Sequence, residues 1–191
     1  MTTPTGQQTS TKTIWKFDPM HTQVEFSAKH LGMMTVRGNF TDVTATGKIY
    51  PDNPQGSSVE ITIKTASIRT HDERRDNDLR SSNFLGIDQF PTMTFKSTKI
   101  EPAGQNRYNV TGDLTIKGNT RPVTLAFVNL GEFNDPMMGH RIGYSAETKI
   151  NRHDFGLTFS MMLDGRMIVS EEVGIFLEGE FVEQPAEAPK A

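Results

Sequence analysis

Histidine is the residue type in this chain best suited to metal binding and to proton transfer at neutral pH. The five histidines are His21, His30, His71, His140 and His153. No two of them stand two or four positions apart, the spacings that bring imidazoles together on one face of a strand or helix. Cysteine, another common metal ligand and nucleophile, is absent from the sequence. We therefore expect no metal site.

A cluster of mixed charge is the second candidate for acid–base chemistry. It consists of Asp72, Asp76 and Asp78 beside Arg74, Arg75 and Arg80. Exposed helices commonly carry such mixed charge, so we interpret the cluster as a solvated helix face. The sequence has no G-x-S-x-G, P-loop or G-x-G-x-x-G motif. We predict no catalytic residue and no required cofactor.

The elements that would position these residues are mainly strands, because apolar and polar residues alternate through most of the chain. Gly112 interrupts one alternating run and predicts a bulge or bend. Clusters of Pro, Gly and Asn at 51–56 and 102–106 predict hairpin loops. The predicted strands, some of which should merge, are 14–18, 22–30, 35–40, 44–50, 57–68, 92–99, 106–117, 121–131, 140–150 and 172–182.

One stretch, residues 71–82, has a helical pattern instead. Thr70 is the expected N-cap, and Glu73 three positions later completes a capping box. The helix is polar nearly all round, so we expect it on the surface or across the mouth of a barrel, with Leu79, Phe84 and Leu85 as its apolar contact.

The pattern as a whole predicts one all-β domain, either a sandwich or a barrel. The chain of 191 residues is long enough for one well-cored domain, which we place at residues 14–183. Residues 1–13 and 184–191 are poor in apolar side chains, and we expect two disordered tails there.

Composition narrows the partners and the compartment. The net charge of −3 and the lack of basic runs interleaved with aromatic residues argue against nucleic-acid binding. No transmembrane span is visible in the sequence. Residues 1–12 have no apolar segment of the signal-peptide kind, so we expect a cytoplasmic protein, or a periplasmic or secreted one if an export signal was removed.

Methionine pairs stand in or beside predicted loops, at Met33-Met34, Met137-Met138 and Met161-Met162. Thioether side chains adapt to irregular apolar surroundings. These pairs have two interpretations, ordinary gap filling and contact with lipid.

Three groups of segments lie within residues 14–182 and carry a resemblance to a known family: 18–26, 29–30 and 36–40, then 67–70, 75–84 and 90–97, and finally 112–120 with 150–156. The last segment reads Ile150-Asn151-Arg152-His153-Asp154-Phe155-Gly156. In their order and spacing, these segments resemble the YceI-like family of polyisoprenoid-binding proteins. The resemblance implies a lipocalin-like antiparallel β-barrel of about eight strands, with an apolar tunnel for an isoprenoid chain.

This resemblance implies a binding protein rather than an enzyme, one that carries or stores an isoprenoid lipid, such as a polyprenyl phosphate or a quinone, or a similar long-chain amphiphile. The headgroup would lie near polar residues of the matching segments, namely His21, His30, Arg152 and His153. The inward parity of the strands would supply the ligand-binding wall: Val24, Phe26, Ala28, His30, Val36, Phe40, Ile61, Ile63, Met93, Phe95, Leu114, Ile116, Leu125, Phe127, Tyr144, Ala146, Ile175 and Leu177.

Two other functions remain open from the sequence. An enzyme acting on an apolar substrate would need a titratable group inside the barrel, and His30, on the apolar parity of its strand, is the best candidate. A protein-interaction module would instead have a solid, filled interior. The sequence leaves homodimerisation open.

Overall fold

A computed structural model of the chain describes residues 14–50 and 53–184. Within these residues the alternating segments form strands and the helical pattern forms one α-helix, α1 (Glu73–Arg80). The long strands are β1 (Ile14–His30), β2 (Met34–Phe40), β3 (Val43–Lys48), β4 (Ser58–Lys64), β6 (Thr92–Gly104), β7 (Arg107–Ile116), β8 (Asn119–Asp135), β9 (Gly139–Asn151) and β12 (Val169–Gln184). The short elements are β5 (Ile68–Arg69), β10 (Met162–Leu163), β11 (Arg166–Met167) and the 3-10 helices η1 (Pro54–Gly56), η2 (Thr65–Ser67) and η3 (Arg152–Phe155).

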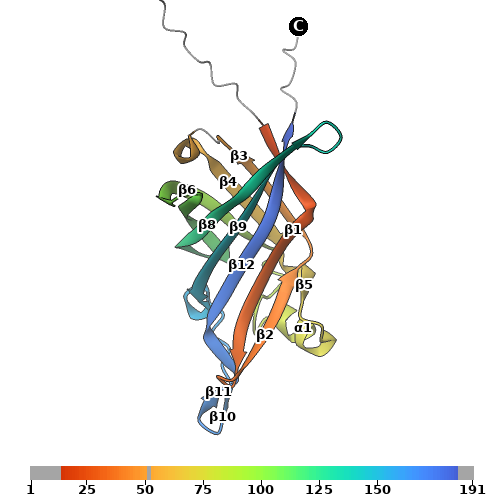
Figure 1. Cartoon of the computed structure of the whole chain (residues 1–191). Coiled ribbons are helices and arrows are strands. Elements are labelled where there is room, and N and C mark those ends of the chain that lie inside the picture. Colours follow the sequence, from red (N-terminus) through yellow and green to blue (C-terminus); the bar gives the residue numbers. More distant parts are fainter. Residues whose placement is uncertain (1–13, 51–52, 185–191) are drawn as a thin grey trace, which may run out of the picture.

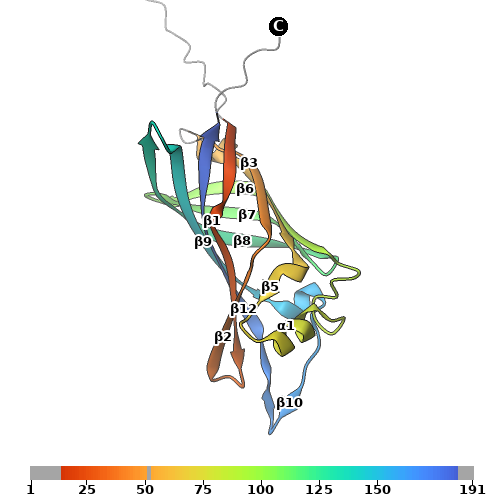
Figure 2. The same ribbon diagram turned by 90° about the vertical axis from the view of Figure 1, so that its right-hand side faces the viewer.

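Among the described residues, eight strands close into an antiparallel barrel in the order β12-β9-β8-β7-β6-β4-β3-β1, because β1 also pairs with β12. β2 pairs with the second half of β1, and the short β5 pairs antiparallel with the end of β2. Figures 1 and 2 show α1 and β5 beside β2 at one end of the barrel. The all-β, lipocalin-like barrel and its single short α-helix are confirmed.

β1 joins two predicted strands through an irregular segment. Asp18 pairs with Glu180 and Gln23 with Glu178, so residues 19–22 of β1 lie opposite the single residue Gly179 of β12. The three extra residues shift the parity of β1 by an odd number. Inward side chains are therefore odd-numbered before the irregularity, as at Trp15, and even-numbered after it, as at Val24.

The two ends of the barrel differ in what fills them. At the Trp15 end, buried Trp15, Ile142 and Phe181 form one core cluster. The opposite end, called the α1 end here, consists of α1, β5, the β1–β2 turn and the β10–β11 hairpin (Figure 2). Between the two ends, Phe95 and its buried neighbours form a separate cluster.

The predicted helix cap is wrong. Asp72, not Thr70, is the N-cap, and its side chain accepts a 2.9 Å hydrogen bond from the Arg75 backbone N–H. His71 has a φ of 61°, which turns the chain between Thr70 and the helix. The buried Thr70 hydroxyl instead donates to Asp76 at 2.5 Å. Asp76 is therefore a buried structural acceptor and not part of a solvated face.

The predicted tails lie mainly outside the described residues, which exclude 1–13 and 185–191. Gln184, assigned to the second tail from the sequence, is the last residue of β12 and pairs with Ile14. No helix in the described part of the chain is long and apolar enough to cross a bilayer.

Candidate functional site

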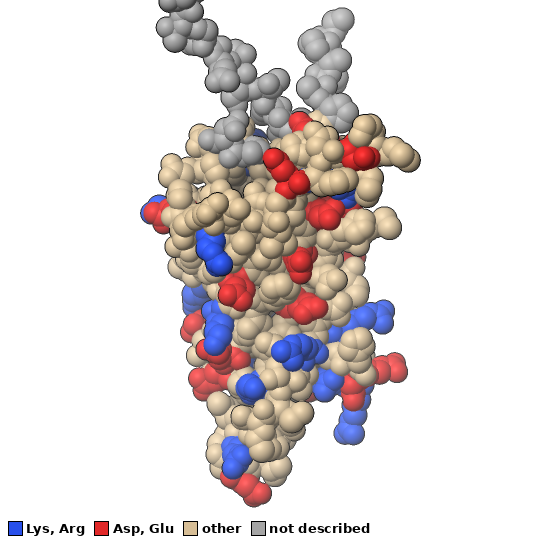
Figure 3. Space-filling view, viewed as in Figure 1, with Lys and Arg blue, Asp and Glu red and all other residues tan. Residues whose placement is uncertain are grey.

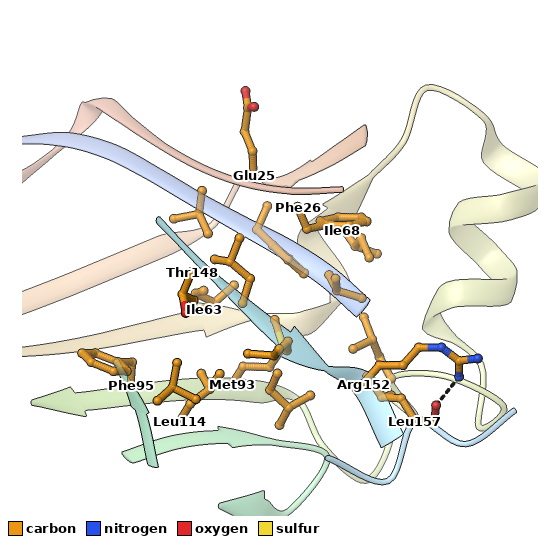
Figure 4. Close-up of a pocket in the computed structure, with 18 of the residues that line it drawn as sticks. Glu25, Phe26, Ile63, Ile68, Met93, Phe95, Leu114, Thr148, Arg152 and Leu157 are labelled. Carbon is orange, nitrogen blue, oxygen red and sulfur yellow. Dashed lines mark hydrogen bonds between the residues drawn. The ribbon is translucent and has the colours of Figure 1, made fainter. Parts of the chain in front are cut away.

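An apolar cavity of about 170 Å³ lies inside the barrel, between its middle and the α1 end. Its walls come from strands on all sides, because each strand directs every second side chain inward. Figure 4 shows part of this wall, with Phe26, Ile63 and Met93 around the cavity. Glu25 also borders the cavity, but its carboxylate points away from the other labelled side chains (Figure 4).

Aromatic and aliphatic side chains close the cavity toward the Trp15 end. Phe95 and Leu125 line it there and pack with Val110 and Ala146, and all four are buried. The Phe95 ring lies over Gly112, where an added Cβ would come within 2.5 Å of the ring. We call these four residues the floor of the cavity.

A second, smaller cavity of about 80 Å³ lies beyond the floor. Val110, Phe127, Tyr144 and Phe181 are among its lining residues. The Phe127 and Tyr144 rings lie 4.9 Å apart, and burial raises the pKa of Tyr144 to about 12. A tyrosine phenol with the ordinary pKa of 10 is already neutral at physiological pH, and burial strengthens this preference for the neutral form.

At the α1 end, the cavity is bordered by side chains that do not come from regular strands. Leu79 of α1, then Phe84 and Leu85 after it, form one side. Leu157 and Val169, which flank the β10–β11 hairpin, form another. These two segments place side chains against the same opening of the barrel.

Arg152 of η3 borders the cavity from this end and is 3% exposed. Its Nε donates to the Ser170 carbonyl at 3.0 Å, and its Nη1 donates to the carbonyls of Phe159, at 2.8 Å, and Leu157. Nη2 reaches the Val169 carbonyl at 3.5 Å. Figure 4 shows the guanidinium directed to Leu157. Most of the Arg152 donors therefore bind main-chain carbonyls on both sides of the β10–β11 hairpin, and connect residues 157–159 with residues 169–170.

Electrostatics at Arg152 follow from its burial. Burial lowers the pKa of Arg152, and the nearby Glu171 carboxylate partly offsets this effect. His153, the next residue, lies 3.9 Å from Glu171 through Nδ1, and its Nε2 is buried without a hydrogen-bond partner in the described structure.

The structure separates the predicted headgroup residues. Arg152 and His153 stand together at the α1 end. His30 is at the same end of β1 but exposed, with Nδ1 3.1 Å from the Ile168 carbonyl. His21 is near the opposite end, 3.0 Å from Asp18. A headgroup role for these residues stays a prediction.

Most of the predicted wall residues border the main cavity. Phe127 and Tyr144 line the second cavity, Ala146 belongs to the floor, and Val36 pairs with Ala28 across β1 and β2 without bordering either cavity. The thirteen predicted residues that border the main cavity are Val24, Phe26, Ala28, Phe40, Ile61, Ile63, Met93, Phe95, Leu114, Ile116, Leu125, Ile175 and Leu177. Their contact with a ligand remains a prediction.

Several wall residues were missed from the sequence. Val123, Ile150 and Val173 share the inward parity of their strands with predicted wall residues, so alternation alone could have identified them. Leu85 and Leu157 lie outside regular strands, where a period of two carries no information.

A polar network occupies the Trp15 end. The Asp18 carboxylate accepts hydrogen bonds from His21, at 3.0 Å, and Arg141, at 2.7 Å, and these lower its pKa to about 2. Arg141 also donates to Glu180 at 2.8 Å. Ligand-type atoms of Asp18, His21 and Glu180 lie within 4.8 Å of one another, but Arg141 already compensates both carboxylates. We therefore interpret this group as an ion-pair network.

Comparison with known proteins agrees with this architecture. The profile of the YceI-like domain matches residues 15–181. A UPF0312 protein of Azotobacter vinelandii is 32% identical over 179 residues, which cover 94% of this chain and 91% of the relative. The crystal structure of Burkholderia cenocepacia BcnA matches with a TM-score of 0.77 and 26% identity, over 86% of this chain and 99% of that one.

A third match is to a structure described as a polyisoprenoid binding domain from Saccharophagus degradans. Its TM-score is 0.64 at 13% identity, with 91% of this chain and all of that chain covered, so this likeness concerns the fold alone. The profile match and the Azotobacter relative both extend over nearly the whole barrel. The chain therefore belongs to the YceI-like family.

Proposed function

We propose that this protein binds an isoprenoid lipid, or a similar long-chain amphiphile, in the apolar cavity and carries or stores it. The observation that carries the proposal is a closed barrel with a cavity between its middle and the α1 end, bordered almost entirely by apolar side chains. The Saccharophagus domain described as polyisoprenoid binding has the same fold and adds support for the ligand class.

The energetics favour a long apolar chain. Each buried methylene contributes about 0.8 kcal/mol, so a chain of several isoprene units binds well with few polar contacts. The cavity of about 170 Å³ is smaller than ordinary ligand sites, which measure about 300–1,000 Å³. A long ligand must therefore move wall side chains, and Leu79, Leu157 and Val169 at the α1 end are among the half-buried ones.

The proposal is binding and not catalysis. Glu25 and Arg152 are the ionisable side chains among the described residues that border the main cavity. The Glu25 carboxylate points outward (Figure 4), and Arg152 is hydrogen-bonded to main-chain carbonyls. Neither is free to act on a bound apolar substrate as a general acid or base. His30, the candidate from the sequence, is exposed and outside the cavity.

The test is native mass spectrometry followed by lipid extraction. Ala28→Trp adds bulk inside the cavity, and we expect at least a tenfold loss of retained lipid, about 1.4 kcal/mol of binding free energy. Ala126→Trp is the matched control, because Ala126 is exposed on the outer face of β8. Lipid-free wild-type protein, or equal retention in the two folded variants, would refute the proposal.

A further inference from the structure

Two hairpins meet at the α1 end of the barrel. The β1–β2 turn and the β10–β11 hairpin are joined by a 3.1 Å hydrogen bond from the Leu31 N–H to the Ile168 carbonyl. His30 contacts the same carbonyl through Nδ1. In Figure 2 both hairpins extend beyond α1 at the lower end of the molecule. We call residues 31–34 and 161–166 the hairpin tips.

The hairpin tips expose an unusual concentration of large apolar side chains. Single exposed apolar residues are normal in soluble proteins, but clusters of them mark sites of contact with a partner or a membrane. Methionine suits a fluid partner because its side chain is flexible. The exposed fractions are 59% for Met33, 68% for Met34, 53% for Met161, 58% for Met162 and 55% for Leu163.

The two segments that carry the tips together have a net positive charge, and the acidic residues that follow the second segment, Glu171 and Glu172, lie beside His153 and Lys149. Residues 26–41 contain Lys29 and Arg37 and no acidic residue. Residues 157–169 contain one residue of each sign, Asp164 and Arg166. Figure 3 shows the lower tip of the molecule as mostly uncharged. Apolar side chains bordered by basic ones are complementary to a bilayer that contains anionic lipid.

The tips are also linked to the cavity. Val169 follows the β10–β11 hairpin and borders the cavity. Arg152 holds the carbonyls of Phe159 and Val169, on the two sides of that hairpin. A membrane in contact with the tips would therefore lie next to the end of the cavity where the wall is half-buried.

The opposite end provides an internal contrast. The β8–β9 turn also exposes apolar residues, with Met137 95% and Phe133 54% exposed. Its surroundings are acidic, because Glu132 and Glu183 both contact His140 there. Exposed large apolar side chains thus occur at both ends, and the charge of the surrounding segments is what distinguishes the two ends.

We propose that the hairpin tips dock this protein on the surface of an anionic phospholipid bilayer. The inference goes beyond lipid binding in the cavity, since it depends on exposed residues that do not border that cavity. Docking would place the half-buried cavity wall beside the bilayer and shorten the path of an apolar ligand through water.

Vesicle flotation tests the proposal with the full chain. We expect binding to vesicles of phosphatidylcholine with phosphatidylglycerol and much weaker binding to phosphatidylcholine alone. The combined variant Met161→Ser, Met162→Ser, Leu163→Ser should lower the partition coefficient at least about tenfold. The matched control, Met137→Ser with Met138→Ser at the acidic end, should leave it unchanged. All variants alter exposed residues, and an unchanged thermal unfolding curve verifies their folding.

A second pair of variants tests the electrostatic part. Lys29→Gln with Arg166→Gln should lower binding to the anionic vesicles about tenfold or more and reduce its salt dependence. Equal binding to neutral and anionic vesicles would overturn the proposal. So would self-association of the wild-type chain in light scattering that the hairpin-tip variant abolishes without any vesicle binding, because the tips would then join two copies.

Failure of the cavity proposal can be distinguished from failure of docking. The Ala28→Trp variant should lose cavity lipid and still float with anionic vesicles. Loss of vesicle binding in this folded variant would show that the bound lipid, and not the hairpin tips, holds the protein on the bilayer, and would overturn the docking proposal.

Discussion

The Trp15 end and the α1 end are formed largely by the same strands, yet the Trp15 end encloses a cavity of only about 80 Å³, whereas the α1 end, called the hollow end here, borders the cavity of about 170 Å³. At the Trp15 end, the Phe181 ring lies 6.0 Å from both Phe17 and Tyr144, in edge-to-face geometry. Toward the α1 end, β12 instead directs Ile175 and Val173 inward, and a cavity of about 170 Å³ remains. Strand alternation therefore determines which side chains point inward, whereas the size of those side chains determines how much of the interior they fill.

Side-chain volume accounts for the difference. Aromatic residues bury about 150–250 Å² each and reach across the narrow interior of an eight-stranded barrel. Aliphatic residues and Ala28 make up most of the wall of the larger cavity, although Phe26, Phe40 and Phe84 border it too. The α1 end is nevertheless packed around this cavity, because a core cluster of six buried residues lies there: Ile68, Leu85, Met93, Ile116, Ile150 and Phe155.

The largest expected effect comes from removing an aromatic ring at the Trp15 end. Phe181→Ala should lower the free energy of unfolding by about 3–5 kcal/mol, because Phe181 is buried and packs edge-to-face on Phe17 and Tyr144. Ile175→Ala, at the hollow end, should cost about 2 kcal/mol, since Ile175 is a smaller side chain and only half-buried. Urea unfolding measures both. Equal losses would mean that the two ends contribute alike.

Arg152 is the polar exception at the hollow end. Arg152→Lys should lower the free energy of unfolding by about 2–3 kcal/mol, because one ammonium cannot reach the carbonyls of Ser170, Phe159 and Leu157 together. If the role is structural, affinities for a prenyl phosphate and a prenyl alcohol should fall equally. A selective loss of the phosphate ligand would instead assign the headgroup to Arg152.

Two alanines compare the cavity with its floor. Ala146→Leu should destabilise the fold by about 1–3 kcal/mol, because Ala146 is packed among Phe95, Val110 and Leu125. Ala28→Leu adds the same side chain where space exists, and should change stability by less than about 1 kcal/mol or raise it. Thermal unfolding of lipid-free protein is the measurement. Similar shifts for the two variants would show that the cavity has no room for the atoms added at Ala28.

The sequence predicts the barrel well because the alternation that indicates a strand is contained within each short segment. Alternation within strands such as 58–64 and 169–184 gives the inward residues directly. Where the pairing of strands is irregular, alternation no longer predicts the bounds of the elements correctly. The irregularity after Asp18 merges two predicted strands, and the positive φ of His71 moves the helix cap to Asp72.

The candidate site was only partly predictable for a related reason. The side chains of Phe84, Leu85 and Leu157 reach the cavity from segments with no strand periodicity. The floor depends on Phe95 packing over Gly112, which is a contact between two strands. No single stretch of sequence contains that contact, so the division of the interior into two cavities appears only once the strands are paired.

The smallest expected effect concerns the polar network of the Trp15 end, which stabilises that end by charge rather than by packing. The pKa of Asp18 is lowered to about 2, through hydrogen bonds from His21 and then Arg141, so its contribution is complete above the ordinary value of 3.8 and disappears as the pH falls toward 2. Asp18→Asn should lower the free energy of unfolding by about 1 kcal/mol at pH 7, because the ion pair that it removes is partly screened by solvent. The difference between wild type and variant in urea unfolding should vanish near pH 2.

The control is Glu172→Gln, which breaks the exposed ion pair between Lys149 and Glu172 on the outer surface of the barrel. Its effect on the free energy of unfolding should be smaller. A difference that persists unchanged to pH 2 would show that Asp18 acts through the backbone of the irregular segment, where it also accepts from the Met20 N–H, and not through its charge.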